Sequence, residues 1–238
     1  MKTIGEWIIM MPHPNKIRGF TLVELLIAMA MSSIVLASIV AAYSSQVRSH
    51  VTQQVVVDMQ QNIRGAMYIM QREIRMAGHD PTGLTGASIL VADDAELQFQ
   101  IDDNGDGDFI DGGGNDFMEQ IRYAMTGGGA LGRQLWNGPL TPLAENIDAI
   151  NFVYLDGADP PNVLATPVPE INRSEIRSVQ ITIVARSGQN MPVLFYRKTD
   201  DRIYRNQQGT IILDMSAAPD SFRRRLLTAE VRCRNLGL

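Results

Sequence analysis

Cysteine and histidine are scarce in this sequence, which limits the chemistry that the chain can perform. Cys233 is the only cysteine, so the chain can form no internal disulfide and no cysteine-based metal cluster. The three histidines, His13, His50 and His79, are far apart along the chain. The sequence also lacks the H-E-x-x-H and G-x-S-x-G motifs and a Walker loop. We therefore predict that the protein is not an enzyme.

Clustered positive charge is scarce as well. The formal net charge is −5, and no stretch of the chain is rich in lysine. Neutralisation of phosphates requires clustered cations, so these features argue against nucleic acid as a main partner. The short basic run Arg223-Arg224-Arg225 is the exception, and we interpret it as a solvated turn or strand edge rather than a ligand site.

A nucleotide-binding helix is also missing. Residues 127–132 formally satisfy the G-x-G-x-x-G pattern of dinucleotide-binding folds. However, the segment that follows contains Asn137-Gly138-Pro139 and cannot form the long helix that such a fold needs. We interpret residues 127–132 as a flexible hairpin loop.

In contrast to these absences, residues 20–43 form an unbroken apolar run with one charge, Glu24. A helix of this length covers roughly 36 Å, enough to cross a bilayer core of about 30 Å. A secretory signal peptide would have a shorter apolar region that ends in a small-x-small cleavage site. Lys16 and Arg18 precede the run, which predicts a cytoplasmic N-terminus and places the rest of the chain outside.

Glu24 is unusual within this run. A carboxylate in a membrane helix costs about 2.5–3.5 kcal/mol on insertion scales and usually has a functional partner. We therefore expect a positively charged group to neutralise Glu24. The alternative is an ordinary membrane anchor in which the Glu24 side chain extends to the cytoplasmic interface.

The start of the apolar run resembles the class III signal of type IV prepilins and type II secretion pseudopilins. The resemblance rests on residues 16–27, which read KIRGFTLVELLI. In that family the prepilin peptidase, a membrane aspartyl protease, cuts after the glycine, the new N-terminal phenylalanine is N-methylated, and a glutamate is the fifth mature residue. Gly19, Phe20 and Glu24 match these positions.

The resemblance implies a division of the N-terminal part and a partner for Glu24. Residues 1–19 would be a leader peptide, and the helix over residues 20–43 would first span the inner membrane and then pack into the core of a pilus-like filament. Cleavage would create a positively charged amine on Phe20. Pairing of this amine with Glu24 of the same or a neighbouring subunit would remove two unpaired charges from an apolar filament core.

Beyond Tyr43 the pattern becomes amphipathic. Apolar residues recur every three or four positions up to Ala77, which predicts that the helix continues over residues 44–78 and packs against a sheet. Gly78 and the following Asp80-Pro81 predict the end of the helix near Ala77.

After residue 83 the period of the hydrophobic pattern changes to two, which predicts half-buried strands. The alternation is clear over residues 97–101, 121–125 and 179–183, and further strand candidates are residues 87–92, 150–155, 193–196 and 229–235. A long helix followed by such strands predicts an α+β fold, in which the helix covers one face of an antiparallel sheet in a β-rich head over residues 79–238. The proline-rich segment 156–173 is predicted to be a long surface loop.

Three further segments narrow the resemblance to PilW-like minor pilins. They are IMQREIRMAG at residues 69–78, EQIRY at residues 119–123 after an aspartate-rich loop, and VRCRNL at residues 231–236. Membership would imply a low-abundance subunit that helps to initiate or cap the filament. Its partners would be other major and minor pilins and the inner-membrane assembly platform. A minor pseudopilin of a type II secretion system is the alternative with the same architecture.

The aspartate-rich loop predicts a calcium site. Residues 102–107 fit D-x-[DN]-x-[DN]-G, in which alternate oxygen-bearing side chains converge on Ca²⁺ and the glycine permits a sharp turn. Asp102, Asn104 and Asp106 would be side-chain ligands, and Asp108 would contribute its backbone carbonyl. The alternative is a solvated acidic hairpin tip.

The proposed site departs from a helix-loop-helix hand in two ways. Gly113 stands where the pattern has a bidentate glutamate, so Asp111, Asp116 or Glu119 would have to supply the closing carboxylate. The flanking segments are also predicted to be strands. We therefore expect a calcium-clamped hairpin, and a further functional alternative is a membrane-anchored adhesin in which Ca²⁺ orders a ligand-contacting loop.

Overall fold

The computed structural model of the chain describes residues 19–109, 119–188 and 199–236. The chain divides into two compact units, residues 1–49 and residues 50–238. Several predictions fall outside the described residues: those for the leader before Gly19, the strand at 193–196, and Asp111, Gly113 and Asp116.

The long helix predicted from the sequence is present as α1, Leu22–Met76. It ends at the predicted glycine, because Gly78 has a φ of 77° and its N–H donates to the carbonyl of Gln100 at 3.0 Å. A Cβ atom on Gly78 would also lie 2.4 Å from the Leu236 side chain, so this position requires glycine for two reasons.

The two halves of α1 differ in the side chains that they bury. None of the side chains of residues 22–49 is buried. By length and composition, α1 is the one helix in the described part of the chain that is able to cross a membrane. Within residues 50–76, one side of the helix is buried in the core, and its buried residues are Met59, Ile63, Ala66, Met67, Met70, Glu73 and Ile74.

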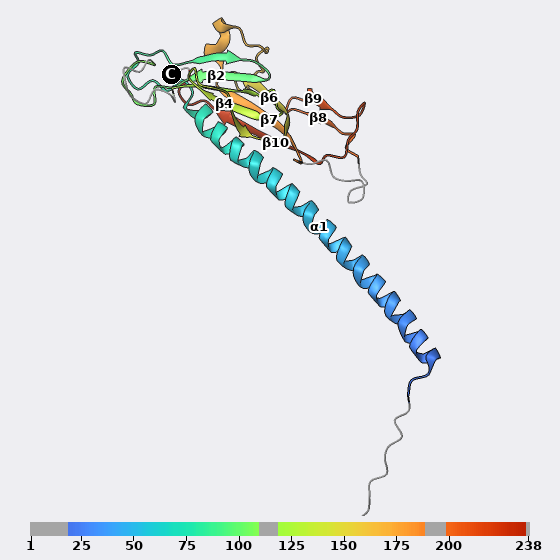
Figure 1. The fold of residues 1–238 in the computed structure, drawn as a ribbon. Helices are drawn as coiled ribbons and strands as arrows, with labels where there is room; N and C mark the ends of the chain where they lie inside the picture. Colours follow the sequence, from blue (N-terminus) through green and yellow to red (C-terminus); the bar gives the residue numbers. More distant parts are fainter. Residues whose placement is uncertain (1–18, 110–118, 189–198, 237–238) are drawn as a thin grey trace, which may run out of the picture. The chain divides into compact units, whose positions relative to one another are not determined.

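Apart from one short 3₁₀ helix, the other elements in the described residues are antiparallel strands in three sheets (Figure 1). The first sheet has the order β1-β2-β3-β4-β5, with β1 Ile89–Ala92, β2 Glu96–Gln100, β3 Gln120–Met125, β4 Leu131–Leu135 and β5 Thr141–Ala144. The second has the order β10-β7-β6, with β6 Ile147–Leu155, β7 Ser178–Arg186 and β10 Arg224–Arg232. Strands β8, Ile203–Arg205, and β9, Ile211–Asp214, pair with each other. The predicted α+β fold with an antiparallel sheet is confirmed.

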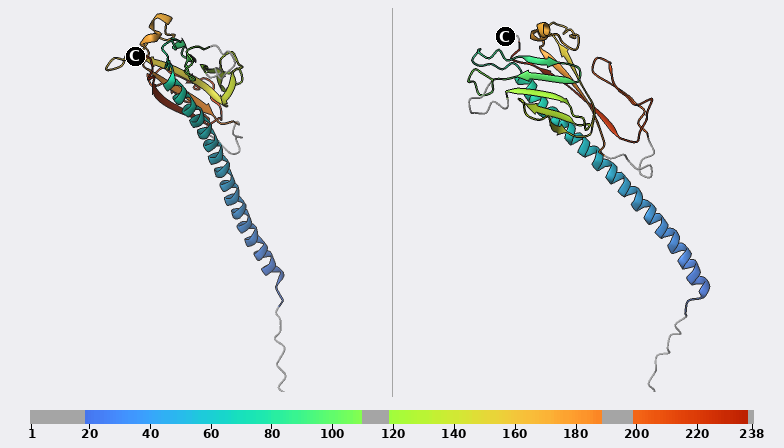
Figure 2. Two further views of the ribbon diagram at one scale, coloured as in Figure 1. Left: turned by 90° about the vertical axis from the view of Figure 1, so that its left-hand side faces the viewer. Right: turned by 45° about the horizontal axis from the view of Figure 1, so that its top comes forward.

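Figure 2 shows both larger sheets together with the C-terminal half of α1 in the unit formed by residues 50–238. One continuous core joins them, because the apolar side of this half-helix packs with inward-facing residues of both sheets. The largest fully buried side chains include Tyr123, Tyr154, Phe99, Phe152 and Met70.

The predicted strands agree with the structure where the alternation is clear, and the bounds differ elsewhere. Strand β10 begins at Arg224 rather than at Ala229. Residues 127–129 form the predicted hairpin turn between β3 and β4, but Leu131 and Gly132 belong to β4 and not to the loop. The segment 156–173 is mostly loop, and a short 3₁₀ helix covers Glu170–Glu175.

A buried polar contact fixes α1 on the first sheet. Glu73 of α1 is 5% exposed, and Arg133 of β4 binds it in a bidentate manner, with Nη2 to Oε1 at 2.7 Å and Nε to Oε2 at 3.0 Å. The hydroxyl of Tyr123 on β3 also donates to Glu73 Oε2. Burial, together with the neighbouring carboxylate, raises the pKa of Tyr123 well above its usual range, so the hydroxyl stays a donor.

Candidate functional site

The first candidate site is the start of α1, where Thr21 and Glu24 cap the helix reciprocally. The Glu24 N–H donates to Thr21 Oγ1 at 3.2 Å, and Glu24 Oε2 accepts from the Thr21 N–H and hydroxyl, both at 2.9 Å. This arrangement is a capping box, which satisfies N–H groups that a helix start otherwise leaves without partners. This role of Thr21 was not predicted from the sequence, although T-x-x-E directly before an apolar run is typical of a capping box.

The capping box leaves one Glu24 oxygen available. Both bonds from Thr21 go to Oε2, and within the described residues Oε1 accepts no hydrogen bond. A carboxylate in this arrangement is able to cap its own helix with one oxygen and to accept a hydrogen bond from a group such as a terminal amine with the other. The predicted partner, the amine of a mature Phe20, would be next to Thr21 in the chain.

The predicted cleavage site lies directly before this cap. Gly19 and Phe20 are non-helical, and Phe20 is 91% exposed. In the described part of the chain, neither residue is held by a backbone hydrogen bond. The Gly19–Phe20 bond is therefore accessible, whereas backbone bonds from Leu22 onward lie within α1.

The second candidate site is the acidic loop between β2 and β3. The predicted hairpin is present, because β2 and β3 pair in antiparallel orientation and the Ile101 N–H donates to the Glu119 carbonyl at 2.8 Å. One carboxylate oxygen from each of Asp102, Asp106 and Glu119 lies within 4.8 Å of the other two. Asp102 is fully buried, Glu119 is 1% exposed, and Asp106 is exposed.

The other two predicted ligands in the described residues, Asn104 and Asp108, form hydrogen bonds within the loop. The Asn104 side chain bonds within the loop, since its Oδ1 accepts from the Asp106 N–H at 2.8 Å and its Nδ2 donates to Asp106 Oδ2 at 2.9 Å. Asp108 is exposed, and its N–H donates to Asp106 Oδ1 at 3.1 Å. Gly107, the glycine of the pattern, has a φ of 88°, as a sharp turn requires.

The geometry of the three carboxylates is compatible with one bound cation. Calcium binds oxygen at about 2.3–2.6 Å, so two oxygens on one ion are at most about 5 Å apart. Of the three residues that the sequence offered as the closing carboxylate, Glu119 is the one that the structure brings to Asp102 and Asp106. Asp111 and Asp116 lie outside the described residues, so their part in the site stays a prediction.

The third feature is the basic run, which lies at the start of the edge strand β10, in agreement with the strand-edge interpretation, but which is not solvated throughout. Arg224 is 5% exposed and therefore is not part of a solvated turn. Its guanidinium binds Asp220 with both terminal nitrogens at 2.6 and 2.7 Å, Asp148 through Nε at 2.5 Å, and Asp200 at 3.4 Å. Burial alone would lower the pKa of Arg224, but the hydrogen bonds that it donates to Asp220 and Asp148 raise the pKa above its usual range.

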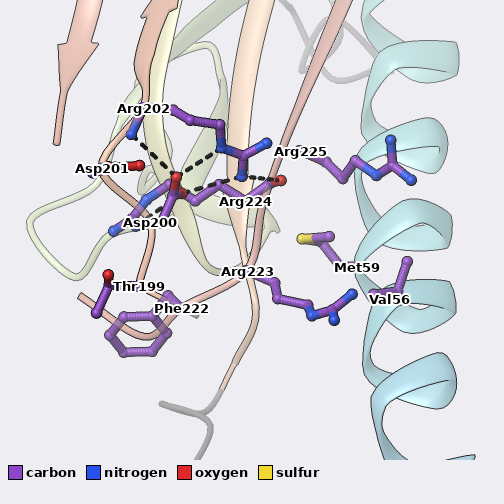
Figure 3. Close-up of a pocket in the computed structure, with 10 residues that line it drawn as sticks. All are labelled: Val56, Met59, Thr199, Asp200, Asp201, Arg202, Phe222, Arg223, Arg224 and Arg225. Carbon is purple, nitrogen blue, oxygen red and sulfur yellow. Dashed lines mark hydrogen bonds and ion pairs between the residues drawn. The ribbon is translucent and has the colours of Figure 1, made fainter. Parts of the chain in front are cut away.

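Figure 3 shows the pocket beside this ion-pair network, between α1 and the start of β10. Its volume is about 370 Å³, and Val56 and Met59 of α1 form part of its wall. Arg202, at the pocket, is paired with Asp200 at 2.7 Å. Three carboxylates surround Arg224 of β10: Asp148 of β6, Asp200 before β8, and Asp220 before β10. The ion-pair network therefore joins these segments, and its role is structural.

Comparison with known proteins adds a sequence match at the N-terminus and a structural similarity. Residues 14–40 match the family model described as the prokaryotic N-terminal methylation motif. No curated protein matches the sequence. A type IV-like pilin from Thermus thermophilus is similar in structure at 14% sequence identity and a TM-score of 0.46, over 75% of this chain and 98% of that one. That similarity is too low to carry a functional argument, but the matched motif contains Gly19, Phe20 and Glu24. The N-terminal segment of this chain thus carries the prokaryotic N-terminal methylation motif, at the residues on which its resemblance to type IV prepilins rests.

Proposed function

We propose that this protein is a minor pilin of a type IV pilus. It is made as a prepilin, cut after Gly19 by the prepilin peptidase, and N-methylated on Phe20. It is first held in the inner membrane by one helix, with a cytoplasmic N-terminus and a periplasmic head, and then enters the filament. The observation that supports this proposal is the methylation motif over residues 14–40, which overlaps the accessible Gly19–Phe20 bond and the start of an exposed apolar helix.

The apolar half of α1 supplies the surface for assembly. Its large side chains, such as Leu25, Ile34 and Ile39, are more than half exposed within the chain itself. An exposed apolar surface of this extent is stable only in a membrane or against other subunits. The proposed partners are therefore other major and minor pilins, which would bury this half-helix, and the inner-membrane assembly platform.

Processing is tested with a pair of matched glycine variants. We expect Gly19→Val to block cleavage by the host prepilin peptidase and Gly65→Val to leave it unchanged. A Cβ atom meets nothing within 4 Å at either position, so neither change disturbs the packing of the chain. Cleavage is measured as a shift to a shorter chain on a denaturing gel. Equal cleavage of both variants would contradict the proposed cleavage site.

The choice between pilus and secretion machinery is tested by deletion of the gene. Loss of surface pili with normal protein secretion supports the minor pilin. Loss of secretion with normal pili would assign the chain to a type II secretion pseudopilus, because the same N-terminal segment would serve either filament.

We further propose that the acidic loop binds Ca²⁺ as a structural ion. The observation that favours this is the convergence of Asp102, Asp106 and Glu119, two of them buried. Such buried carboxylates repel each other unless a cation lies between them. Asp102 and Glu119 would bind the ion from the ends of the paired strands, and Asp106 would complete the coordination from the loop.

The calcium proposal is tested on the full chain in detergent. We expect Ca²⁺ to raise the unfolding temperature of the head and a chelator to reverse the effect. The double substitution Asn104→Ala with Asp106→Ala should abolish the Ca²⁺ response. If Ca²⁺ raised the unfolding temperature of the double variant as much as that of the unchanged chain, Asn104 and Asp106 would not be ligands. If the double variant is stable and forms pili but cells no longer attach to surfaces, the adhesin alternative gains support.

A further inference from the structure

Strand β10 lies at one edge of the second sheet, and half of its backbone groups point away from that sheet. The Ser187 N–H donates to the Arg223 carbonyl at 2.8 Å, and the Cys233 N–H donates to the Arg177 carbonyl at 2.9 Å. Residues that bond to a neighbouring antiparallel strand alternate along the chain, so the odd-numbered residues of β10 bond to β7. The even-numbered residues therefore direct their N–H and carbonyl groups away from the sheet.

Four of these even-numbered residues form a free strand edge. This surface is here named the β10 edge, and its residues are Leu226, Thr228, Glu230 and Arg232. All four are exposed, and within the described part of the chain their backbone N–H and carbonyl groups have no partner. Arg224 differs, because its carbonyl accepts from the Arg202 side chain at 3.3 Å. The β10 edge is about 20 Å long at the rise of a strand.

The outer strands β6 and β1 of the two larger sheets are shielded by the chain itself. The Phe152 N–H of β6 donates to the Asp94 carbonyl at 2.7 Å, and the Ala92 carbonyl of β1 accepts from the Val168 N–H at 2.8 Å. The remaining outer strand, β5, has four residues, and Pro142 within it has no N–H. A free strand edge is a template for pairing with another chain, and proteins usually shield it. The β10 edge is therefore a candidate docking site.

The surroundings of the β10 edge are basic. Arg225 and Arg232 of β10 are exposed, and so is Arg234 just after the strand. Arg75 of α1 is also exposed, and its carbonyl accepts from the Arg234 N–H at 3.4 Å. In the described residues the side chains of these four arginines form no hydrogen bond or ion pair. The acidic residue of the strand, Glu230, already accepts hydrogen bonds from two side chains of β7.

We propose that the β10 edge binds an extended acidic segment of a partner protein, which adds to the second sheet as a fourth strand. Main-chain hydrogen bonds to the β10 edge supply affinity, and carboxylates of the segment pair with the arginines beside it. A second copy of this chain does not fit through the same edge, because two basic surfaces would then face each other. The proposal is independent of the proposed function, since it uses only residues of the unit 50–238.

The proposal is tested by amide exchange of the full chain in detergent, followed by NMR with and without a probe peptide. The probe has about seven residues, in which glutamate and valine alternate, so its length matches the β10 edge. We expect the four N–H groups of the edge to exchange quickly in the free chain and at least about tenfold more slowly with the probe in excess. Exchange at Leu227 and Ala229, which bond to β7, should not change.

Two substitutions at one position provide the matched comparison. Thr228→Pro removes an N–H that faces away from β7, so it should abolish the protection of the other three residues and leave the pairing of β10 with β7 intact. Thr228→Ala keeps this N–H and should keep the protection. A probe that is N-methylated throughout should give no protection of the unchanged chain. This last measurement decides the question if the proline variant does not fold.

The remaining outcomes would overturn the proposal. Equal protection by a probe with lysine in place of glutamate would show that the arginines do not select an acidic segment. No protection by the glutamate probe would show that the edge does not bind such a strand. Slow exchange at the β10 edge without a probe would mean that it is already covered. The cover would be a second copy if exchange slows as the protein concentration rises, and this chain itself if it does not.

Discussion

Removing the negative charge of Glu73 should destabilise the head strongly, because this carboxylate is the buried anchor between α1 and the first sheet. Glu73 accepts hydrogen bonds from Arg133 and Tyr123 and is 5% exposed. The substitution Glu73→Gln keeps the size of the side chain but leaves the Arg133 charge without compensation.

The structure sets the expected magnitude. Breaking a buried ion pair by removing one partner costs about 3–5 kcal/mol. The Arg133 side chain is 18% exposed, so water compensates for part of the loss and we expect a value of about 3 kcal/mol. With a urea dependence of about 2 kcal/mol per molar, the unfolding midpoint should fall by about 1.5 M.

The matched control is Glu96→Gln, the same chemical change in the more exposed pair of Glu96 with Arg122. Those two side chains are 30% and 32% exposed, so this change should cost less than about 1 kcal/mol. Unfolding of the mature chain in mild detergent can be followed by fluorescence, because Trp136, directly after β4, is its one tryptophan once the leader with Trp7 is removed. Equal shifts for Glu73→Gln and Glu96→Gln would refute this account of the anchor.

Four further predictions concern other parts of the chain. Removing the helix cap with Thr21→Ala should cost about 1 kcal/mol at the start of α1, seen as faster amide exchange over the first turn, whereas Ser38→Ala, within the helix, should not change exchange there. Arg224→Met should destabilise the head by about 3–5 kcal/mol in urea unfolding, because it leaves three carboxylates without their shared partner, and Arg225→Met should change stability by less than about 0.5 kcal/mol. The hydrogen bonds from Arg224 lower the pKa of Asp220, so this carboxylate stabilises the fold above its unfolded pKa of about 4, and that stability should be lost as the pH falls through the lower folded value; an unfolding temperature that stays constant from pH 5 to pH 2.5 would contradict this. Burial raises the pKa of Cys233 to about 12, so mass spectrometry should find no maleimide adduct on the folded chain at pH 8 and complete labelling after unfolding.

The parts of the fold that were predictable are those in which local pattern and tertiary structure agree. The unbroken helical pattern and the glycine at its end gave α1, and two-residue alternation gave strands such as β2, β3 and β7. Strands β4 and β5 were missed because they are short and contain Gly132 and Pro142, which disfavour strands in sequence analysis. Both strands form because β3 pairs with β4 and β4 pairs with β5.

The sites were predictable where one continuous segment supplies the residues. Gly19, Phe20 and Glu24 form one motif, and the calcium pattern located Asp102 and Asp106 in the same way. The choice of Glu119 as the third carboxylate depended on the register of β2 with β3, which residue spacing does not determine.

Contacts between distant segments were the main omission. Arg224 meets Asp148 across 76 positions of sequence, and Glu73 meets Arg133 across 60. A charge in a basic run is usually solvated, so the run gave no indication that Arg224 is buried. Glu73 did carry a signal, since it stands on the apolar side of the amphipathic helix beside Met70 and Ile74.

The intact mass and N-terminal sequence of the membrane-extracted protein test the central claim most directly. In a host with prepilin peptidase, we predict a chain that begins at Phe20 and is about 14 Da heavier than its sequence because the new amine carries a methyl group. Without the peptidase the leader should remain. A chain that keeps its leader in both hosts would contradict the prepilin account.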